Sequence, residues 1–548
     1  MHRIFTIGHV VSGIVSWMLP AELTTTVCVN DVWFEASIPL LWKEVRLKHA
    51  LCVLGQVGNQ PFKVPTPEKW ERFQTYSKYV QILQAGERDS LALKIAMGSR
   101  PTTIPYLFPN CRFLTWDTMS DRGFLDFNAL ISPSLERFCL YTHDLERSFF
   151  HRICEQLKSS SPTLKCLQLD ISISRPPNGR TEECEDLFHD LLTFFAPSLN
   201  AVQIPEVFRT ESTMKKLYEI PKLCQLMIEV PGFFLCDEDV PLKKYAGYDG
   251  RGGFTSLENI TFGGKQASLC NGLLHRFNLV SLQVLRWNLE KELSDVETFI
   301  SIIVENCPQL HTLDVGDSRM YFNYEKPRPV VAWQVIRPLL RCQKLQRLSL
   351  HCFQVSLLNE LRELLTNRVT WTCLKVYTEF PLRMTDLWLF AEHCPNLEEL
   401  GVNINGFFQW GKIPNSDKIK ISFPVLTSID FAYSHFTPHM ARSVASFLFE
   451  HCERPVQLLG WDMRFWDCVS ITLCELYMVR AKRSRKPWSS EVLLFVERIL
   501  NEVVLEQEMF VDDYGHFPLV NLSGPEGRLF ATVAIRQILD YFSHHNNH

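Results

Sequence analysis

Several signatures of catalytic and metal-binding proteins are missing from this sequence of 548 residues. It contains no HExxH or GxSxG motif and no cysteine and histidine spacing typical of a zinc site, which excludes the common hydrolase and metalloenzyme classes. The formal net charge is only -5, without the basic field that would indicate nucleic acid as the main partner. These absences favour a protein that has no active site and no cofactor of its own.

The sequence also lacks a long apolar run and any clustering of its cysteines. No stretch reaches the roughly 18 to 20 apolar residues that a membrane helix needs. The 18 cysteines are spread between Cys28 and Cys474 without a CxxC pair, which is typical of buried, reduced thiols rather than of a disulfide framework or a zinc site. We therefore expect a protein of the cytoplasm or the nucleus, without a membrane span or a bound metal.

The first apolar pattern in the chain has the spacing of a helix. Its members are Ile7, Val10, Val11, Ile14 and Met18. Two further short helical elements are predicted between Pro20 and Trp42. Three helices of this size cannot bury their apolar surface among themselves, so the surplus predicts contact with the rest of the chain or with another protein.

The order of residues in this stretch matches a known motif. An amphipathic helix is followed by Leu19-Pro20 and Leu23, then by Val27-Cys28-Val29 and Trp33, and finally by Leu41-Trp42. This order resembles the F-box. The resemblance implies that the stretch binds the Skp adaptor and, through it, a cullin in a Skp-cullin-F-box ubiquitin ligase. The adaptor-facing residues that it implies are Ile7, Val10, Ile14, Leu23, Val27, Val29, Trp33 and Trp42.

Two other interpretations of the N-terminal stretch stay open. It is also compatible with a helical cap that covers the first repeat of the following domain. A secretory signal peptide is disfavoured because His2, His9 and several other polar residues interrupt the apolar run, and no cleavage site of small residues follows.

From about residue 110 the chain repeats units of the form L-x-x-Φ-x-Φ, in which Φ is apolar. They recur about every 29 residues, a period typical of leucine-rich repeats. The last two apolar residues of a unit are two apart, so a strand directs both to one side. Helical stretches such as 296–303 and 440–448 lie between units. The leading residues are Leu135, Leu164, Leu199, Leu223, Leu257, Leu282, Leu310, Leu345, Leu397 and Leu426, with weaker units led by Cys111 and Leu374.

The predicted fold class is α/β, with a parallel sheet inside an irregular, curved solenoid and helices outside it. We expect a three-helix F-box-like motif over 1–46, a helical linker over 47–105, the solenoid over 106–450 and a helical C-terminal cap with a tail over 451–548. The linker residues Trp70, Phe73, Tyr76 and Val80 resemble the segment after the motif in fungal F-box proteins. Surface loops are expected at 174–180 and 243–255, and the basic run 480–486 is either a nuclear import signal or a solvated loop.

The function that these features favour is a substrate receptor, in which the motif binds the adaptor and the solenoid binds an unknown protein client. The alternative is a non-catalytic interaction scaffold whose degenerate motif recruits no ligase. The acidic pair at 512–513 is interpreted as part of a turn rather than as an acid and base pair. Residues expected to face the client from the strands are Gln168, Asp170, Gln225, Glu229, Arg286, Thr312, Asp314, Arg347, His351, Asn403 and Asp430.

Overall fold

The structure is a computed structural model. It describes residues 8–18, 20–55, 64–86, 89–118, 129–142, 146–171, 181–205, 208, 210–228, 254–264, 274, 279–289, 296–316, 330–356, 360–366, 370–383, 386–404, 422–431, 452 and 457–459. Several predicted features lie outside these residues: Ile7, Glu229, the loop 174–180, most of the loop 243–255, the helix at 440–448, the acidic pair at 512–513 and the C-terminal cap beyond residue 459 with its basic run.

Within the described residues, 16 strands form a single sheet. Every pair of neighbouring strands is parallel, and strand order follows chain order except that β11 pairs with the end of β12. The strands are β1 (Glu44–Arg46), β2 (Ile82–Gly86), β3 (Phe113–Thr118), β4 (Arg137–Thr142), β5 (Cys166–Ile171), β6 (Ala201–Ile204), β7 (Gln225–Ile228), β8 (Asn259–Gly264), β9 (Val284–Leu289), β10 (Thr312–Val315), β11 (Val330–Ala332), β12 (Arg347–Ser356), β13 (Cys373–Thr378), β14 (Glu399–Gly401), β15 (Ser428–Asp430) and β16 (Gln457–Leu459).

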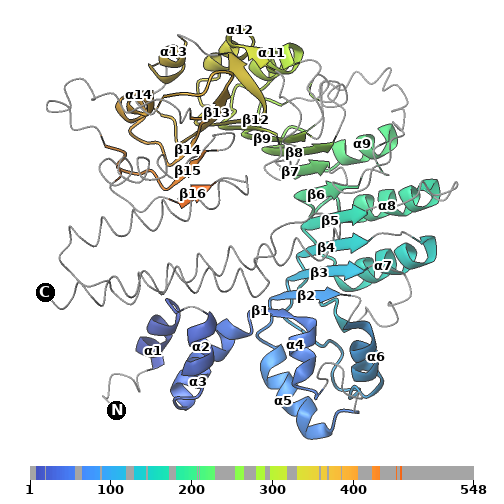
Figure 1. Ribbon diagram of the computed structural model, residues 1–548. Coiled ribbons are helices and arrows are strands. Elements are labelled where there is room, and N and C mark those ends of the chain that lie inside the picture. Colours follow the sequence, from blue (N-terminus) through green and yellow to red (C-terminus); the bar gives the residue numbers. More distant parts are fainter. Residues whose placement is uncertain are drawn as a thin grey trace, which may run out of the picture.

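The strands follow an arc, and the helices between them lie on its outer side (Figure 1). The helices are α1 (Gly8–Val15), α2 (Pro20–Thr26), α3 (Asp31–Leu41), α4 (Leu47–Cys52), α5 (Pro67–Ser77), α6 (Ser90–Gly98), α7 (Arg147–Ser160), α8 (Thr181–Phe195), α9 (Glu211–Tyr218), α11 (Val296–Asn306), α12 (Trp333–Ile336), the 3-10 helix η6 (Arg337–Arg341), α13 (Leu361–Thr366) and α14 (Leu387–His393). The predicted alternation of strand and helix over a parallel sheet is confirmed for the described residues, and it is the arrangement of a leucine-rich-repeat-like solenoid.

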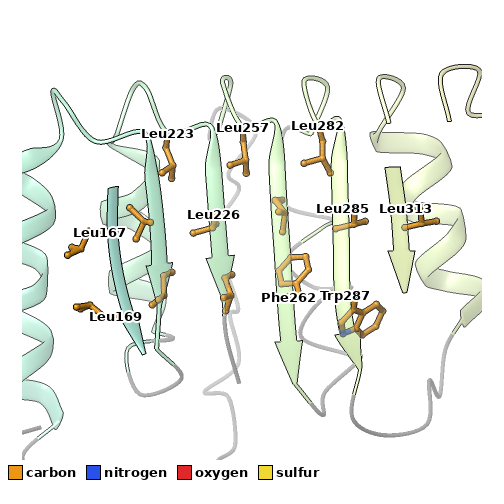
Figure 2. Packing of buried hydrophobic residues seen from close by; sticks show 14 of the residues in the cluster. Leu167, Leu169, Leu223, Leu226, Leu257, Phe262, Leu282, Leu285, Trp287 and Leu313 are labelled. Atoms are coloured by element: carbon orange, nitrogen blue, oxygen red, sulfur yellow. The ribbon is translucent and has the colours of Figure 1, made fainter. Parts of the chain in front are cut away.

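The middle apolar residue of each repeat lies beside its counterpart in the next strand. Leu226 pairs with Ile260, Ile260 pairs with Leu285, and Leu285 pairs with Leu313. All four are fully buried, as are the leading leucines that precede them by three residues (Figure 2). Because side chains alternate across a strand, this register directs the first and third residues of each strand to the opposite, inner side of the sheet.

The helices cover the outer side of the sheet with apolar stripes of helical spacing. In α11 the buried residues are Val296, Phe299, Ile300, Ile302 and Ile303, which recur at three and four residues. The ring of Phe299 lies 4.6 Å from that of Trp287 on β9, centroid to centroid. Within one repeat the helix thus packs on the strand that precedes it, while the middle residues of successive strands lie side by side, so that each repeat is stabilised by its neighbours.

The sheet begins earlier and ends later than the sequence indicated. β1 starts at Glu44 and β2 lies in the segment expected to be a helical linker, while β16 lies beyond the expected end of the solenoid at residue 450. Val80, Leu83 and Ala85 form the same apolar triplet as the later units, and all three are buried. The small Ala85 and the absence of a leading leucine concealed this repeat.

One repeat had been assigned with a shift of three residues. Leu374 pairs with Leu348 and Leu400, so it occupies the middle position and not the leading one. Trp371 takes the leading position and is fully buried, with its indole Nε1 donating to the Leu364 carbonyl at 3.3 Å. A tryptophan in place of the expected leucine therefore caused the error, and its position midway between Leu345 and Leu397 restores an even spacing.

We predict that Leu285→Ala lowers the free energy of unfolding by about 2–5 kcal/mol, because it leaves a cavity between β8 and β10. Chemical denaturation followed by circular dichroism measures the change. The control is Gln283→Ala, two residues earlier, where the side chain is exposed. Equal stabilities of the two variants would contradict the assignment of the middle leucines to the core.

Candidate protein-binding surfaces

Helices α1 to α3, here called the N-terminal module (residues 8–42), have a small core of their own. Val11, Val15 and Leu23 are buried, and Met18, Val32, Trp33, Ala36 and Leu41 pack against them. The core of the solenoid begins at Leu47 and includes none of these residues. The module is therefore a small body with a core of its own, and Trp42 at its end is the residue that packs against the core of the solenoid.

Local hydrogen bonds hold the three helices together. The Thr26 and Ser37 hydroxyls, both buried, lie 2.8 Å apart and connect α2 with α3. The Asn30 side chain caps α3 by accepting a hydrogen bond of 3.1 Å from the Trp33 backbone N–H, which satisfies one of the amides that the first helical turn leaves unpaired.

The residues expected to face an adaptor occupy different environments in the module. Val10, Ile14, Val27 and Trp33 are half-buried, whereas Val29 is 45 % exposed. Leu23 is only 4 % exposed and lies in the core of the module, so it supports the helices instead of reaching a partner. Of the seven expected residues that the structure describes, five therefore keep side-chain surface on the module itself, and Trp42 belongs to the joint described below.

Two exposed apolar residues of the module were missed by the sequence interpretation. Trp17 is 91 % exposed and Leu40 is also exposed. Trp17 follows Val10 by seven residues and Ile14 by three, so the three share one side of the first helix and the turn after it. The interpretation had continued this stripe to Met18, which packs on the module core instead. The spacing 10, 14, 17 was the signal that could have identified Trp17.

An aromatic joint connects the module to the first repeats. The Trp42 and Tyr76 rings are stacked with centroids 4.9 Å apart and an interplanar angle of 15°, and Phe34 lies 6.4 Å from Tyr76 on its α3 side. The Arg72 guanidinium lies 5.9 Å from the Tyr76 centroid. The Lys43 carbonyl accepts backbone hydrogen bonds of 2.9 Å from Gln81 and Ile82, and β1 begins at the next residue. The module is thus joined to the sheet without a flexible linker.

We predict that Tyr76→Ala loosens this joint, because an aromatic pair contributes about 0.5–1.5 kcal/mol beyond its buried area. Hydrogen exchange of the backbone amides from Trp42 to Arg46 should accelerate about 2- to 10-fold. Tyr79→Ala, which removes a half-buried tyrosine outside the joint, is the matched control. Unchanged exchange in the Tyr76 variant would show that the aromatic contact does not hold the module.

The second candidate surface is the inner face, defined as the first, third and fifth residues of each strand. Its third row from β9 to β15 is Arg286, Asp314, Ser349, Lys375, Gly401 and Asp430. Its first row over the same strands is Val284, Thr312, Arg347, Cys373, Glu399 and Ser428. Parallel pairing with no slip brings these side chains together from segments more than 100 residues apart in the sequence. We call Arg286, Asp314, Arg347, Lys375 and Glu399 the charged patch.

Glu399 is the centre of the charged patch. Its Oε1 accepts a hydrogen bond from Arg347 Nη2, and its Oε2 lies 3.1 Å from Lys375 Nζ and 3.7 Å from the Cys373 sulfur, whose thiol donates to it. Burial alone would raise the pKa of the Glu399 carboxyl, but the hydrogen bonds and charges of Arg347 and Lys375 outweigh burial and lower the pKa. One ionised carboxylate therefore connects β12, β13 and β14.

Gly401 makes room for this network. A Cβ atom at this position would lie 2.7 Å from Lys375 Cβ and Cγ and 2.9 Å from the Tyr377 hydroxyl. The missing side chain lets Lys375 and Tyr377 lean across β14, where Tyr377 donates a hydrogen bond of 2.9 Å to Asp430 Oδ2. Any larger residue at 401 would push both side chains out of their present positions.

Asp314 is a second acid of the charged patch, and its surroundings favour ionisation less than those of Glu399 do. Burial raises the pKa of its carboxyl, partly offset by Ser349 on the neighbouring strand and by the charges of Lys375 and Arg286. Its Oδ1 atom is buried and makes no hydrogen bond of standard geometry among the described residues. Its ionised form is therefore disfavoured by folding, the opposite of Glu399.

The structure places most of the expected client-facing residues on the inner face, with different exposure. Arg286 is exposed, whereas Gln168, Asp170, Gln225, Thr312, Asp314 and Arg347 are half-buried. Gln168 accepts a hydrogen bond of 2.7 Å from the Cys139 thiol. The sequence interpretation omitted Lys375 and Glu399, because the shifted repeat at Leu374 hid the position of Lys375 in the third row.

Three expected client-facing residues are buried instead. Asn403 is 1 % exposed, and its amide group hydrogen-bonds both the backbone N–H and the backbone carbonyl of Thr378, at 2.7 and 2.6 Å. Asp430 is bonded to Tyr377, and the ring of His351 lies 5.3 Å from the Tyr377 ring. The expectation of client contact is therefore corrected for these residues. Asn403 instead satisfies backbone groups of Thr378, where β13 ends.

The thiols of the inner face have raised pKa values. Burial raises the pKa of the Cys139 and Cys373 thiols to about 12, so they stay protonated and are poor nucleophiles. The cysteines of the described segments are free thiols. Neither a group of His, Cys, Asp and Glu that could hold a metal ion nor a helix long and apolar enough to cross a membrane occurs in the part of the chain that the structure describes.

Comparisons with known proteins add little to this description. No family model matches the sequence, and no curated protein matches it. Among solved structures the chain is similar to the plant peptide hormone receptor RGFR1 in complex with RGF2, with 14% identity and a TM-score of 0.27 over 71% of this chain and 56% of that chain. The chain thus spans little more than half of that receptor. At this TM-score the likeness carries no argument, and the fold assignment rests on the parallel register.

We predict that neutralising the two acids of the charged patch has opposite effects. Glu399→Gln should lower stability near neutral pH by about 1–3 kcal/mol, because it leaves partly buried cations without their acceptor. The lowered pKa means that the contribution of Glu399 is present above its unfolded pKa and is lost as pH falls through the folded pKa. Asp314→Asn should leave stability unchanged or raise it, because a raised pKa costs stability as pH increases.

Thermal unfolding of both variants and the wild type between about pH 3 and pH 8 measures these effects, because the lowered pKa of Glu399 places its loss at the acidic end. The difference in melting temperature between the wild type and Glu399→Gln should narrow towards low pH. The difference between the wild type and Asp314→Asn should widen towards high pH. A destabilising Asp314→Asn would contradict the described environment of that carboxyl.

Proposed function

We propose that the chain is the substrate-recognition subunit of a Skp-cullin-F-box ubiquitin ligase. In this proposal the N-terminal module binds the Skp adaptor, and the solenoid binds a protein client near the ubiquitin-transfer machinery. The observation that carries the proposal is the apolar surface of the module, which has a core of its own and keeps Trp17, Val29 and Leu40 exposed. Exposed aromatic and aliphatic clusters of this kind are typical of protein interfaces.

The main alternative is a scaffold in which the module only caps the repeats. A cap would share buried residues with the first repeat, whereas Val11, Val15 and Leu23 form a cluster apart from the solenoid core. Contact between the two bodies is made through the joint at Trp42 and Tyr76. This separation favours a surface intended for another protein, while an extended parallel sheet by itself supports only the broader function of a protein-interaction scaffold.

In the proposed complex the chain contributes position rather than bond chemistry. Holding a client beside the transfer machinery replaces a bimolecular encounter by a high effective concentration. The rigid joint supports this function because it limits the orientations that the sheet can take relative to the module. The abundance of buried, protonated thiols supports a location in the cytoplasm or the nucleus.

The test is co-purification of the full chain with the Skp adaptor. Val29→Asp should abolish binding because it introduces a charge on the exposed side of the module without touching its core. Trp33→Ala and Val27→Asp are expected to act in the same direction. Val64→Asp, the same substitution at a more exposed valine outside the module, is the matched control.

Point variants are preferable to deletion of residues 1–46, because that deletion would remove β1 from the sheet. Circular dichroism should remain unchanged for Val29→Asp and Val64→Asp. Failure of the wild-type chain to bind the adaptor, or retained binding by Val29→Asp, would contradict the ligase proposal. The chain would then be assigned only as a protein-interaction scaffold.

A further inference from the structure

The charged patch exposes two arginines, and the oxygens of its most accessible acid, Glu399, are already engaged by its cations. The Arg286 side chain is exposed, and Arg347 and Lys375 keep part of their surface accessible. Both oxygens of Glu399 are already engaged, Asp430 is almost completely buried, and Oδ1 of Asp314 is covered. An approaching molecule therefore meets the donors of Arg286 and Arg347, and a Glu399 carboxylate whose oxygens already have cationic partners.

The donors of the patch also outnumber the acceptors available to them. A guanidinium has five N–H groups and an ammonium has three. Arg347 and Lys375 share the single carboxylate of Glu399, and Arg286 makes no hydrogen bond or ion pair among the described residues. Most of the donor capacity of the three cations is therefore unused, and it suits a ligand rich in acceptor oxygens.

The cations of the inner face are concentrated in one part of it. From β2 to β8 the first and third rows contain a single charged residue, Arg137, among neutral side chains such as Gln84, Cys139 and Gln203. From β9 to β14 the same rows contain three cations on three strands. Elsewhere on the described strands these rows hold only two further cations, Arg46 on β1 and Arg137 on β4, so the cations of the patch form one group on neighbouring repeats, as a recognition site requires.

We propose that the charged patch binds an acidic, extended segment of a client protein through the carboxylates of its Glu or Asp residues. Arg286 and Lys375 lie in the same row, three strand spacings or about 14 Å apart. In an extended peptide, side chains at i and i+4 lie on one side about 13 Å apart. A segment that crosses the strands places carboxylates at i and i+4 on these two cations and one at i+2 near Arg347.

The client belongs to the proposed ligase function, but binding of an acidic segment does not depend on adaptor recruitment. The probe is a fluorescein-labelled 12-residue peptide with Glu at alternating positions in a Ser and Gly background, titrated with the full chain and followed by fluorescence anisotropy. A peptide with Gln in place of Glu is the uncharged counterpart. We expect binding of the Glu peptide that weakens with salt, and binding of the Gln peptide that is at least tenfold weaker.

The protein variants assign the binding to the patch. Arg286→Glu should weaken binding about tenfold or more, and Lys375→Gln should weaken it in the same direction. Arg112→Glu, which reverses an exposed arginine just before β3, is the matched control and should leave binding unchanged. Because Arg286 is exposed, its variant is expected to fold, and circular dichroism verifies this.

Equal binding of the Glu and Gln peptides, or wild-type affinity in Arg286→Glu, would overturn the proposal. A phosphoserine peptide that binds more than tenfold tighter than the Glu peptide would also overturn it, by assigning the patch to phosphate groups. Adaptor co-purification is measured with the same variants. If the adaptor fails to bind while the Glu peptide still requires Arg286, the ligase function fails and the acidic-segment site stands.

Discussion

Each strand of the sheet has to place its middle apolar residue beside that of its neighbours, because a slip of one residue would turn the buried side chains towards water. The row that runs through Leu226, Ile260, Leu285 and Leu313 meets this condition without a bulge. The same alignment fixes where every inner-face side chain lies. The positions of Arg286, Lys375 and Glu399 therefore follow from the packing of the neighbouring buried residues on the other side of the sheet.

The inner face depends on this register for its electrostatics as well. Glu399 can accept from Arg347 and Lys375 at once only because β12, β13 and β14 present these residues at matching heights. Gly401 supplies the space in which Lys375 crosses the strand. Asp314 on β10, three strands from Glu399, lacks an equivalent arrangement, and burial raises the pKa of its carboxyl. Two acids of the same patch thus differ because of their neighbours and not because of their own chemistry.

The repeat pattern made most of the solenoid predictable, since leucines three residues before a Φ-x-Φ pair mark both the strand and its buried side. The prediction failed where another residue replaced the leucine. Trp371 and Val80 lead repeats that were shifted or overlooked, because volume and burial, rather than residue identity, are what the core requires. Helical spacing likewise predicted the module, but the stripe was continued to Met18 although Trp17 is the exposed member.

The client-facing residues were harder to predict, because alternation along a strand says which side a residue faces but not what covers it. Asn403 was expected to face a client from a strand, yet it lies two residues beyond β14 and its amide group is hydrogen-bonded to the backbone of Thr378. Lys375 and Glu399 were overlooked because ion pairs between repeats join residues that are distant in sequence. Such pairs become visible only once the register of neighbouring strands is known.

Because the module is joined directly to β1 at Trp42, the number of strands sets how far along the sheet an inner-face residue lies from the module. From β1 onwards each repeat advances the inner face by one strand spacing, about 4.8 Å. The distance from the N-terminal module to the charged patch is then counted in strands, and it changes in discrete steps when repeats are gained or lost. Insertion or loss of repeats would thus change the separation of the N-terminal module and the charged patch without altering the residues of either surface.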